Sequence, residues 1–238
     1  MKNFQQILTR RAGMIGMMCL LTAALSSCMK NHDDYVDVPF GLVSVINTSP
    51  DAQSQDFYLD NNRANNSPIS YGHGLDYIKA YTGKRTASFF NSATQQKTKS
   101  DTLTVRANNY YSVYLSNLAS KPDVIILTDT IRQPAAGMAT IRLVNLSPDA
   151  PAVDLAIKGG AVLATNKAYK AYSGFVPVTG NTKYTLEVRQ AGTTTVLASL
   201  TDVNIYSASV YTVWLQGLSA ATDQTKLTAG LQQNVYFY

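Results

Sequence analysis

The sequence repeats itself at a nearly constant offset, and this internal duplication limits what the chain can fold into. Residues 45–52 read VINTSPDA and recur at 143–150 as LVNLSPDA. Residues 111–118 read YSVYLSNL and recur at 211–218 as YTVWLQGL. The two offsets are 98 and 100 residues. Blocks that recur in the same order at one spacing indicate two tandem copies of one domain. We predict that the copies cover residues 41–131 and 139–238, joined by a linker at 132–138.

Within each copy the apolar residues follow the period of a β-strand. Residues 101–106, 140–145 and 184–189 alternate between apolar and polar side chains, as half-buried strands do. Residues 124–127 (VIIL) form a continuous apolar run of strand length. About seven short strands per copy, separated by turns, predict an all-β fold of two tandem antiparallel β-sandwich domains. The spacing does not decide between an immunoglobulin-like and another Greek-key topology.

The repeated block contains a turn motif whose side chains can bond the backbone. Proline fixes φ near −65° and suits a turn, while Asn, Ser and Asp can hydrogen-bond nearby amides. We expect these residues to lock the connection between the first two strands of each copy, and the alternative is a cation or ligand site at the tip of the sandwich. The motif residues are Asn47, Ser49, Pro50, Asp51, Asn145, Ser147, Pro148, Asp149 and Asp154.

The first 27 residues are predicted to be a signal peptide. Basic residues that include Arg10 and Arg11 precede an apolar run at 12–25, which is too short for a good membrane span. The segment Leu25-Ser26-Ser27-Cys28 resembles the bacterial lipobox. That resemblance implies cleavage before Cys28, acyl chains on Cys28, and a tether at 28–40. The alternative is an ordinary signal peptide with an accidental cysteine.

Composition excludes several classes of protein. The chain has 238 residues, of which 45% are apolar, and only two cysteines, so it is neither a disordered tail nor a disulfide framework. Residues 1–27 hold three of the 20 basic residues and no acidic one, which leaves 17 basic against 15 acidic side chains. A nearly neutral mature chain gives no electrostatic footprint for nucleic acid. A lipid anchor would place the protein in the bacterial cell envelope, on the outer membrane and facing the periplasm or the cell surface.

The sequence carries no recognised catalytic, metal-binding or cofactor-binding motif, so we expect no catalytic residues, no metal site, no cofactor and no enzymatic activity. Exposed aromatic rings could stack on sugars or anchor a protein interface, although many tyrosines simply pack on sheets. Two triplets, at 101–103 and 129–131, resemble bacterial O-glycosylation acceptors with Thr102 and Thr130 as the sites. The candidate ligand-binding residues are Tyr71, His73, Tyr77, Tyr81, Tyr169 and Tyr172.

The second copy resembles a known family. Residues 140–155, which run from TIRLVN through LSPDAPAVDL, are similar to the strand-turn-strand hallmark of the DUF4397 family of bacterial cell-envelope proteins. The first copy departs from it, since Ser44 stands where Arg142 stands and Gln53 where Pro151 stands. The resemblance implies secreted or lipid-anchored β-sandwich modules, often in tandem. It brings no catalytic residues.

These observations support two hypotheses. The first is a noncatalytic cell-envelope lipoprotein with tandem β-sandwich modules and a binding, adhesive or structural role. The alternative is a glycan-binding accessory subunit or a carbohydrate-active enzyme of the envelope. In both, the membrane is contacted through Cys28, and a glycan or an envelope protein would be the partner.

Overall fold

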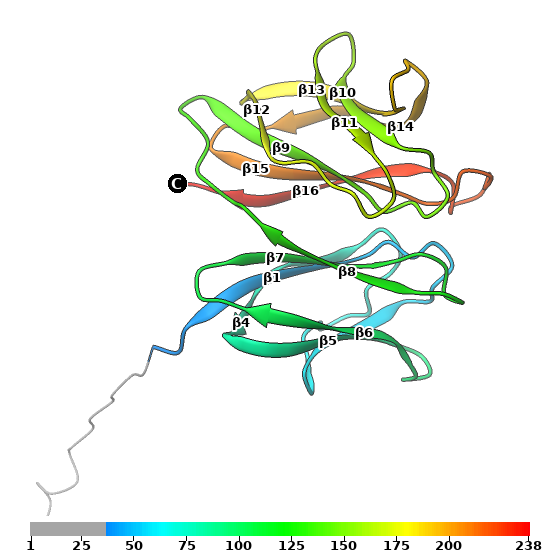
Figure 1. Ribbon diagram of the computed structural model, residues 1–238. Helices are drawn as coiled ribbons and strands as arrows, with labels where there is room; N and C mark the ends of the chain where they lie inside the picture. Colours follow the sequence, from blue (N-terminus) through cyan, green and yellow to red (C-terminus); the bar gives the residue numbers. More distant parts are fainter. Residues whose placement is uncertain (1–36) are drawn as a thin grey trace, which may run out of the picture. The chain divides into compact units, whose positions relative to one another are not determined.

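The computed structural model describes residues 37–238, and these contain sixteen β-strands and no helix. Accordingly, no helix in this part of the chain could cross a membrane. The predicted signal peptide, the lipidation of Cys28 and most of the tether lie outside the described residues. The described chain from residue 39 onward forms one compact unit, and the all-β fold is as predicted (Figure 1).

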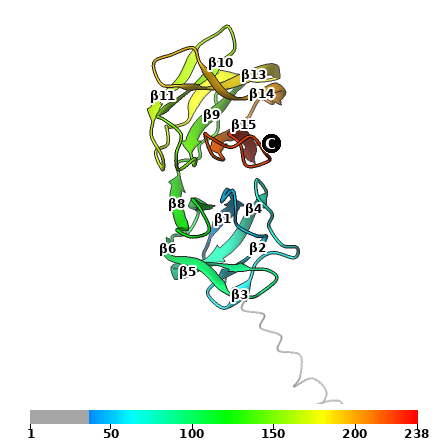
Figure 2. The same cartoon turned by 90° about the vertical axis from the view of Figure 1, so that its right-hand side faces the viewer.

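The first sandwich is built from two four-stranded sheets, with the strand orders β4-β1-β7-β8 and β3-β2-β5-β6. Figure 2 shows β1 and β4 in one layer, with β2 and β3 in the other. The strands are β1 (Phe40–Asn47), β2 (Gln55–Leu59), β3 (Asn62–Arg63), β4 (Gly74–Tyr81), β5 (Gly83–Asn91), β6 (Lys97–Val105), β7 (Tyr110–Ser116) and β8 (Asp123–Asp129).

The second sandwich repeats this arrangement strand for strand. Its sheets have the orders β12-β9-β15-β16 and β11-β10-β13-β14. The same topology in both copies is the structural counterpart of the sequence duplication. The strands are β9 (Met138–Asn145), β10 (Val153–Ile157), β11 (Val162–Lys167), β12 (Val176–Thr179), β13 (Thr182–Gln190), β14 (Val196–Ile205), β15 (Ser209–Gln216) and β16 (Thr228–Tyr236).

Two details of the predicted sandwich need correction. Each copy has eight strands, not about seven. One sheet of each copy is mixed and not purely antiparallel, because β1 pairs in parallel with β7, and β9 pairs in parallel with β15. These partners lie far apart in the sequence, so no tight turn fixes their direction. Alternation of apolar residues shows which face of a strand is buried and carries no information on the direction of its neighbour.

Each sandwich encloses its own core between its two sheets. In the first, Phe57 and Phe89 are fully buried and their ring centroids lie 5.1 Å apart. In the second, the core is mainly aliphatic, with Leu143, Leu155 and Leu186 almost fully buried. Burial of large apolar side chains between two layers is the main source of stability in such a sandwich.

A repeated tyrosine fastens the start of one strand to the chain before it. The phenolic oxygen of Tyr111 accepts a hydrogen bond from the amide of Arg106 at 3.0 Å, and Tyr211 accepts one from the amide of Tyr206 at 3.0 Å. Both rings are buried. This arrangement is similar to the tyrosine corner of immunoglobulin-like sandwiches, which explains why both copies carry tyrosine here.

Candidate functional site

The turn motif of the first copy uses its side chains to bond the backbone. Asn47 Oδ1 accepts a hydrogen bond from the amide of Ser49 at 3.1 Å. Ser49 Oγ donates to the carbonyl of Asn117 at 2.6 Å, and Asp51 Oδ1 accepts from the amide of Ala119 at 2.7 Å. The turn after β1 is therefore tied to the loop after β7, and not only to the neighbouring β2. Pro50 lies at the centre of this turn.

The second copy makes the equivalent bonds. Asn145 Oδ1 accepts from the amide of Ser147 at 3.1 Å, and Ser147 Oγ donates to the carbonyl of Gly217 at 2.7 Å. Asp149 accepts from the amide of Ser219 at 2.9 Å, next to Pro148. Since these oxygens already have backbone partners in both copies, the geometry is that of side chains that stabilise a turn and not that of an open ligand site. Residues 37–238 contain no group of three His, Cys, Asp or Glu side chains that could hold a metal ion.

Asp154 fastens a different part of the second sandwich. Its two carboxylate oxygens accept hydrogen bonds from the amide of Asn166 at 2.7 Å and the amide of Gly192 at 2.9 Å. The side chain is 7% exposed. One carboxylate thus joins the end of β11 to the turn between β13 and β14.

The two sandwiches meet through homologous sheets, β4-β1-β7-β8 from the first and β12-β9-β15-β16 from the second. Apolar side chains from both sheets form a third buried cluster. Tyr114 and Trp214, which occupy equivalent positions in the repeat, both belong to it. The buried members are Ile46, Tyr114, Ile125, Leu127, Val144, Leu146 and Trp214. We call this contact the inter-sandwich interface.

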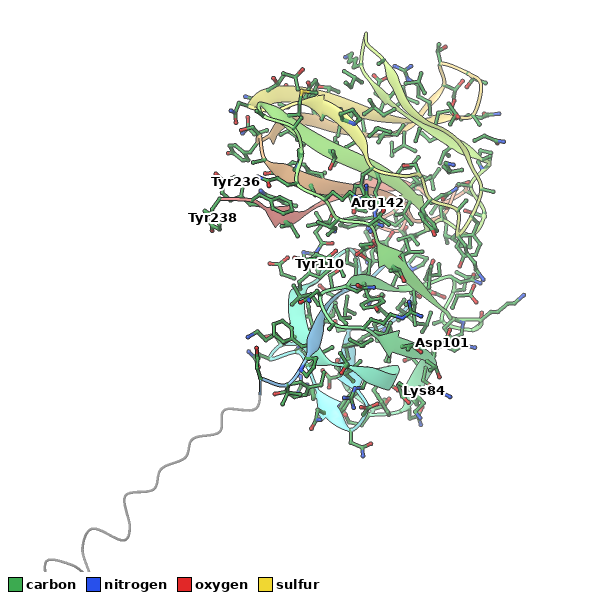
Figure 3. All side chains as sticks on the ribbon, turned by 60° about the vertical axis from the view of Figure 1, so that its left-hand side comes forward. Lys84, Asp101, Tyr110, Arg142, Tyr236 and Tyr238 are labelled. Carbon is green, nitrogen blue, oxygen red and sulfur yellow. The ribbon has the colours of Figure 1, made fainter. Side chains whose placement is uncertain are left out.

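An ion pair lies buried in the inter-sandwich interface. The guanidinium of Arg142 (labelled in Figure 3) lies 2.7 Å from the carboxylate of Asp129, and the two side chains are 2% and 0% exposed. Arg142 also donates to Thr212 Oγ1 at 2.9 Å and to Ser112 Oγ at 3.1 Å. Its guanidinium carbon is 4.7 Å from the centroid of the Phe175 ring. Each charge of the pair is therefore compensated within a water-poor environment, as a buried ion pair requires.

Tyr77 and Asn234 extend this network. The Tyr77 hydroxyl donates to Asp129 Oδ2 at 2.6 Å and accepts from Asn234 Nδ2 at 3.1 Å. Asn234 Oδ1 in turn accepts from Thr212 at 2.6 Å. Burial and the neighbouring charge of Asp129 raise the pKa of Tyr77 well above its ordinary value. The Tyr77 ring packs edge-on against Tyr110 (labelled in Figure 3), and the two ring centroids lie 5.2 Å apart.

Two further tyrosines of the sequence analysis lie at equivalent places in the same interface. The Tyr169 hydroxyl donates to Asp123 Oδ2 of the first sandwich at 3.0 Å, and the adjacent Lys170 pairs with the same oxygen at 2.9 Å. The pKa of Tyr169 is raised above its ordinary value, mainly by burial. Tyr71 precedes Tyr169 by 98 residues, and its buried hydroxyl lies near Thr228 of the second sandwich. Each sandwich therefore extends one tyrosine towards the other.

The remaining candidates are exposed and lie apart from one another. Tyr172 is 48% exposed. His73 is exposed, with Nδ1 3.0 Å from the carbonyl of Tyr71, and it lines a polar groove of about 430 Å³ with Asp76 and Gln232. Tyr71, Tyr77 and Tyr169 thus belong to the inter-sandwich interface, and the residues predicted to bind a ligand do not converge on one site.

Tyr81 borders a second hollow, of about 340 Å³, at the edge of the first sandwich. Tyr81 is 59% exposed. Charged and amide side chains that sequence reasoning missed surround it, because they come from separate strands and loops and share no spacing pattern. The polar lining residues are Asp60, Asn62, Arg63, Lys79, Tyr81 and Arg85.

The two glycosylation-like triplets differ in their surroundings. Asp101 and Thr102 are both exposed on β6. Thr130 is exposed, but the preceding Asp129 is buried in the ion pair with Arg142. A modifying enzyme that reads the aspartate side chain would reach it only in the first triplet.

Solved structures share low similarity with the chain. A family CBM26 module of Eubacterium rectale Amy13K in complex with maltoheptaose is 9% identical, with a TM-score of 0.27, over 82% of this chain and 97% of that one. A structure described as alpha-glucan binding by a streptococcal virulence factor is 11% identical, with a TM-score of 0.23, over 80% and 97% of the two chains. A comparison with curated proteins finds no match.

One family model matches the sequence, and its extent crosses from the first sandwich into the second. The matched residues, 41–156, comprise the first sandwich and continue through β9 into β10 of the second. They include both partners of the buried ion pair, Asp129 and Arg142. Residues 41–156 match the model of the family described as "Domain of unknown function (DUF4397)".

Proposed function

We propose that the protein is a noncatalytic, lipid-anchored component of the bacterial cell envelope, whose two sandwiches act together as one binding or structural module. The anchor is proposed from the lipobox-like segment that ends at Cys28. The observation that carries the single-module role is the inter-sandwich interface with its buried pair of Arg142 and Asp129. A flexible tandem array would leave these charges in water. Here each sandwich completes the other's polar network, so the two modules hold a fixed relation to each other.

The chemistry of the repeated carboxylates supports a noncatalytic role. Asp51, Asp149 and Asp154 all accept hydrogen bonds from backbone amides in turns. A general acid or base must instead exchange its proton with a substrate in a cleft. When the purified protein is tested against a panel of polysaccharides, we expect it to turn over none of them. Turnover that an Asp→Asn substitution abolishes would establish the rival hypothesis of a carbohydrate-active enzyme.

The anchor is tested by comparing the wild type with Cys28→Ala in the cells that make it. Several acyl chains give durable attachment, since each buried CH₂ contributes about 0.8 kcal/mol. We expect the wild-type protein in the membrane fraction and the variant in the soluble fraction. Protease treatment of intact cells then assigns the face, because removal of the wild type means that it faces outward. Unchanged membrane attachment of Cys28→Ala would overturn the lipoprotein proposal.

A glycan-binding accessory role is the second candidate function, and the hollow beside Tyr81 favours it. An exposed aromatic ring beside fixed polar side chains is a common way to hold a sugar face and its hydroxyl groups. The hollow lies apart from the inter-sandwich interface, so the two roles are compatible.

A further inference from the structure

The hollow beside Tyr81 has an apolar floor and a polar rim. Its floor consists of Leu59, Ala64, Ile78 and Ala80, contributed by the two sheets of the first sandwich and the short segment between them. The rim is charged and carries Tyr81. A hollow of about 340 Å³ with this division suits a small amphipathic group, apolar on one face and polar around its edge. A sugar ring has this character.

Two arginines of the rim are held in place before any ligand arrives. Arg85 donates through Nε to the carbonyl of Tyr81 at 2.9 Å, through Nη1 to Asp60 at 3.1 Å, and through Nη2 to the carbonyl of Thr82 at 2.9 Å. These bonds use three of its five N–H groups and leave two free. The Arg85 side chain is 29% exposed, so part of it can be reached from solvent. A side chain fixed in this way loses little conformational entropy on binding.

Arg63 is fixed by a second carboxylate. It lies 2.7 Å from Asp56, which is 3% exposed, while Arg63 itself is 40% exposed. Asp56 is held in turn by Asn65 at 3.0 Å and Gln95 at 2.9 Å. Burial acts to raise the pKa of Asp56, but the hydrogen bonds from Gln95 and Asn65 and the charge of Arg63 lower it overall. The Asp56 carboxylate therefore stays ionised and keeps Arg63 at the rim.

The rim is rich in hydrogen-bond donors, and one of its positive charges, that of Lys79, has no ion-pair partner among the described residues. Three cations, Arg63, Lys79 and Arg85, line the hollow with one carboxylate, Asp60. That carboxylate is already occupied, since one oxygen accepts from Arg85 and the other from the amide of Thr86. Lys79 lies over the Phe40 ring at 4.7 Å and forms no ion pair with a described residue. A ligand with negative charge and acceptor oxygens complements such a rim.

The second sandwich provides an internal comparison. By strand pairing, Pro177 takes the place of Lys79 and Thr179 the place of Tyr81. Tyr184 takes the place of Arg85. The turn motif and the tyrosine corner are kept in both copies, whereas Lys79, Tyr81 and Arg85 are replaced in the second copy by residues of other types. Residues that serve the common fold would be expected in both.

We infer that the hollow bounded by Tyr81, Lys79, Arg63 and Arg85 is a binding site for an acidic saccharide, with the sugar ring against Tyr81 and its carboxylate toward the cations. This inference deepens the proposed binding role and rests on it. The Tyr81 ring supplies the stacking surface, and Lys79 supplies a charge that has no ion-pair partner among the described residues. Arg63 and Arg85 supply donors in fixed positions.

The test uses the full-length protein in detergent micelles and measures binding of an oligogalacturonate by calorimetry. A neutral galactose oligomer of the same length serves as the comparison ligand. We expect Tyr81→Ala to weaken binding of the acidic oligomer by about tenfold or more. Lys79→Gln should weaken it by about three- to tenfold and reduce its dependence on salt, because a screened charge contact is lost.

Two matched controls separate the site from general effects. Lys84 (labelled in Figure 3) is exposed and does not line the hollow, so Lys84→Gln removes a charge from the same sandwich outside the site. Tyr172→Ala removes an exposed ring from the second sandwich. Both controls should bind like the wild type. Equal binding of the neutral oligomer, full binding by Tyr81→Ala, or no binding of the acidic oligomer would each overturn the inference. If Cys28→Ala still releases the protein from membranes in that case, the envelope lipoprotein proposal stands without this site.

Discussion

At the scale of single residues, the arginine at position 142 has a physical explanation. The DUF4397-like block carries arginine here, and the first copy has Ser44 at the equivalent position. Arg142 lies at 2% exposure against Asp129 of the preceding sandwich. Burial acts to lower the pKa of Arg142, but the surrounding groups, Tyr114 and Asp129 first among them, raise it. In the first copy, Ser44 at the equivalent position instead donates a hydrogen bond to Ser112 Oγ at 3.3 Å.

Removing one partner of this pair should be costly. Asp129→Ala leaves the Arg142 guanidinium buried without its carboxylate, and half of a buried ion pair costs about 3–5 kcal/mol. We expect the free energy of unfolding, measured by urea titration, to fall by that amount. The double variant Asp129→Leu with Arg142→Met removes both charges and should recover most of the loss. A loss below about 1 kcal/mol for Asp129→Ala would show that water reaches the pair.

At the scale of the strands, the sequence predicted which segments form strands but not which sheet packs against their outer faces. The alternating stretches at 101–106, 140–145 and 184–189 fall largely or wholly within β6, β9 and β13. The period of two marks an inner and an outer face for each strand. In β9, Leu143 faces the sandwich core and Val144 faces the other sandwich. Nothing in the alternation shows that a second sheet covers the outer face.

The same limit applies to the tyrosines. Tyr71, Tyr77 and Tyr169 stand in stretches rich in Gly, Asn and Lys, which favoured exposed loops. The structure places all three in the inter-sandwich interface. Local sequence could not predict this, because contacts between domains join segments that are far apart in the chain. The one sequence signal for this placement was that Tyr71 and Tyr169 lie 98 residues apart, which is the offset of the duplication. A tyrosine that is repeated in both copies favours a structural role, since a ligand site need not occur in both. Tyr81 has no tyrosine at its equivalent position and remains exposed.

A glycine of β16 shows how closely the strands pack on Trp214. A Cβ added to Gly230 would lie 2.1 Å from Cζ2 of the indole. Trp214 is 5% exposed, and its Nε1 donates to Gln216 at 2.8 Å, so the ring cannot swing away freely. We expect Gly230→Ala to cost about 1–3 kcal/mol through overpacking. Urea unfolding followed by tryptophan fluorescence measures it. Gly174→Ala is the control, because a Cβ there meets no atom within 4 Å. Equal stability of the two variants would contradict the packing argument.

At the scale of the whole described unit, the interface makes the stability of one sandwich depend on the other. Each sandwich has a separate core, and the third cluster is shared between them. Two independent domains would unfold in separate steps, whereas a shared buried cluster couples them. We therefore expect calorimetry of the wild-type protein to show a single unfolding transition.

Neighbouring residues of β9 allow this coupling to be tested without ambiguity. Val144→Asp buries a charge in the inter-sandwich interface, while Leu143→Asp buries the same charge in the core of the second sandwich. Both residues are 0% exposed, so the cost of desolvation is comparable and only the affected layer differs. Val144→Asp should leave two folded sandwiches that melt in two separate transitions. Leu143→Asp should unfold the second sandwich and leave one transition from the first. If Val144→Asp still melts in one step at an unchanged temperature, the sandwiches are held together by contacts other than this cluster, and the proposed fixed relation between them would need another basis.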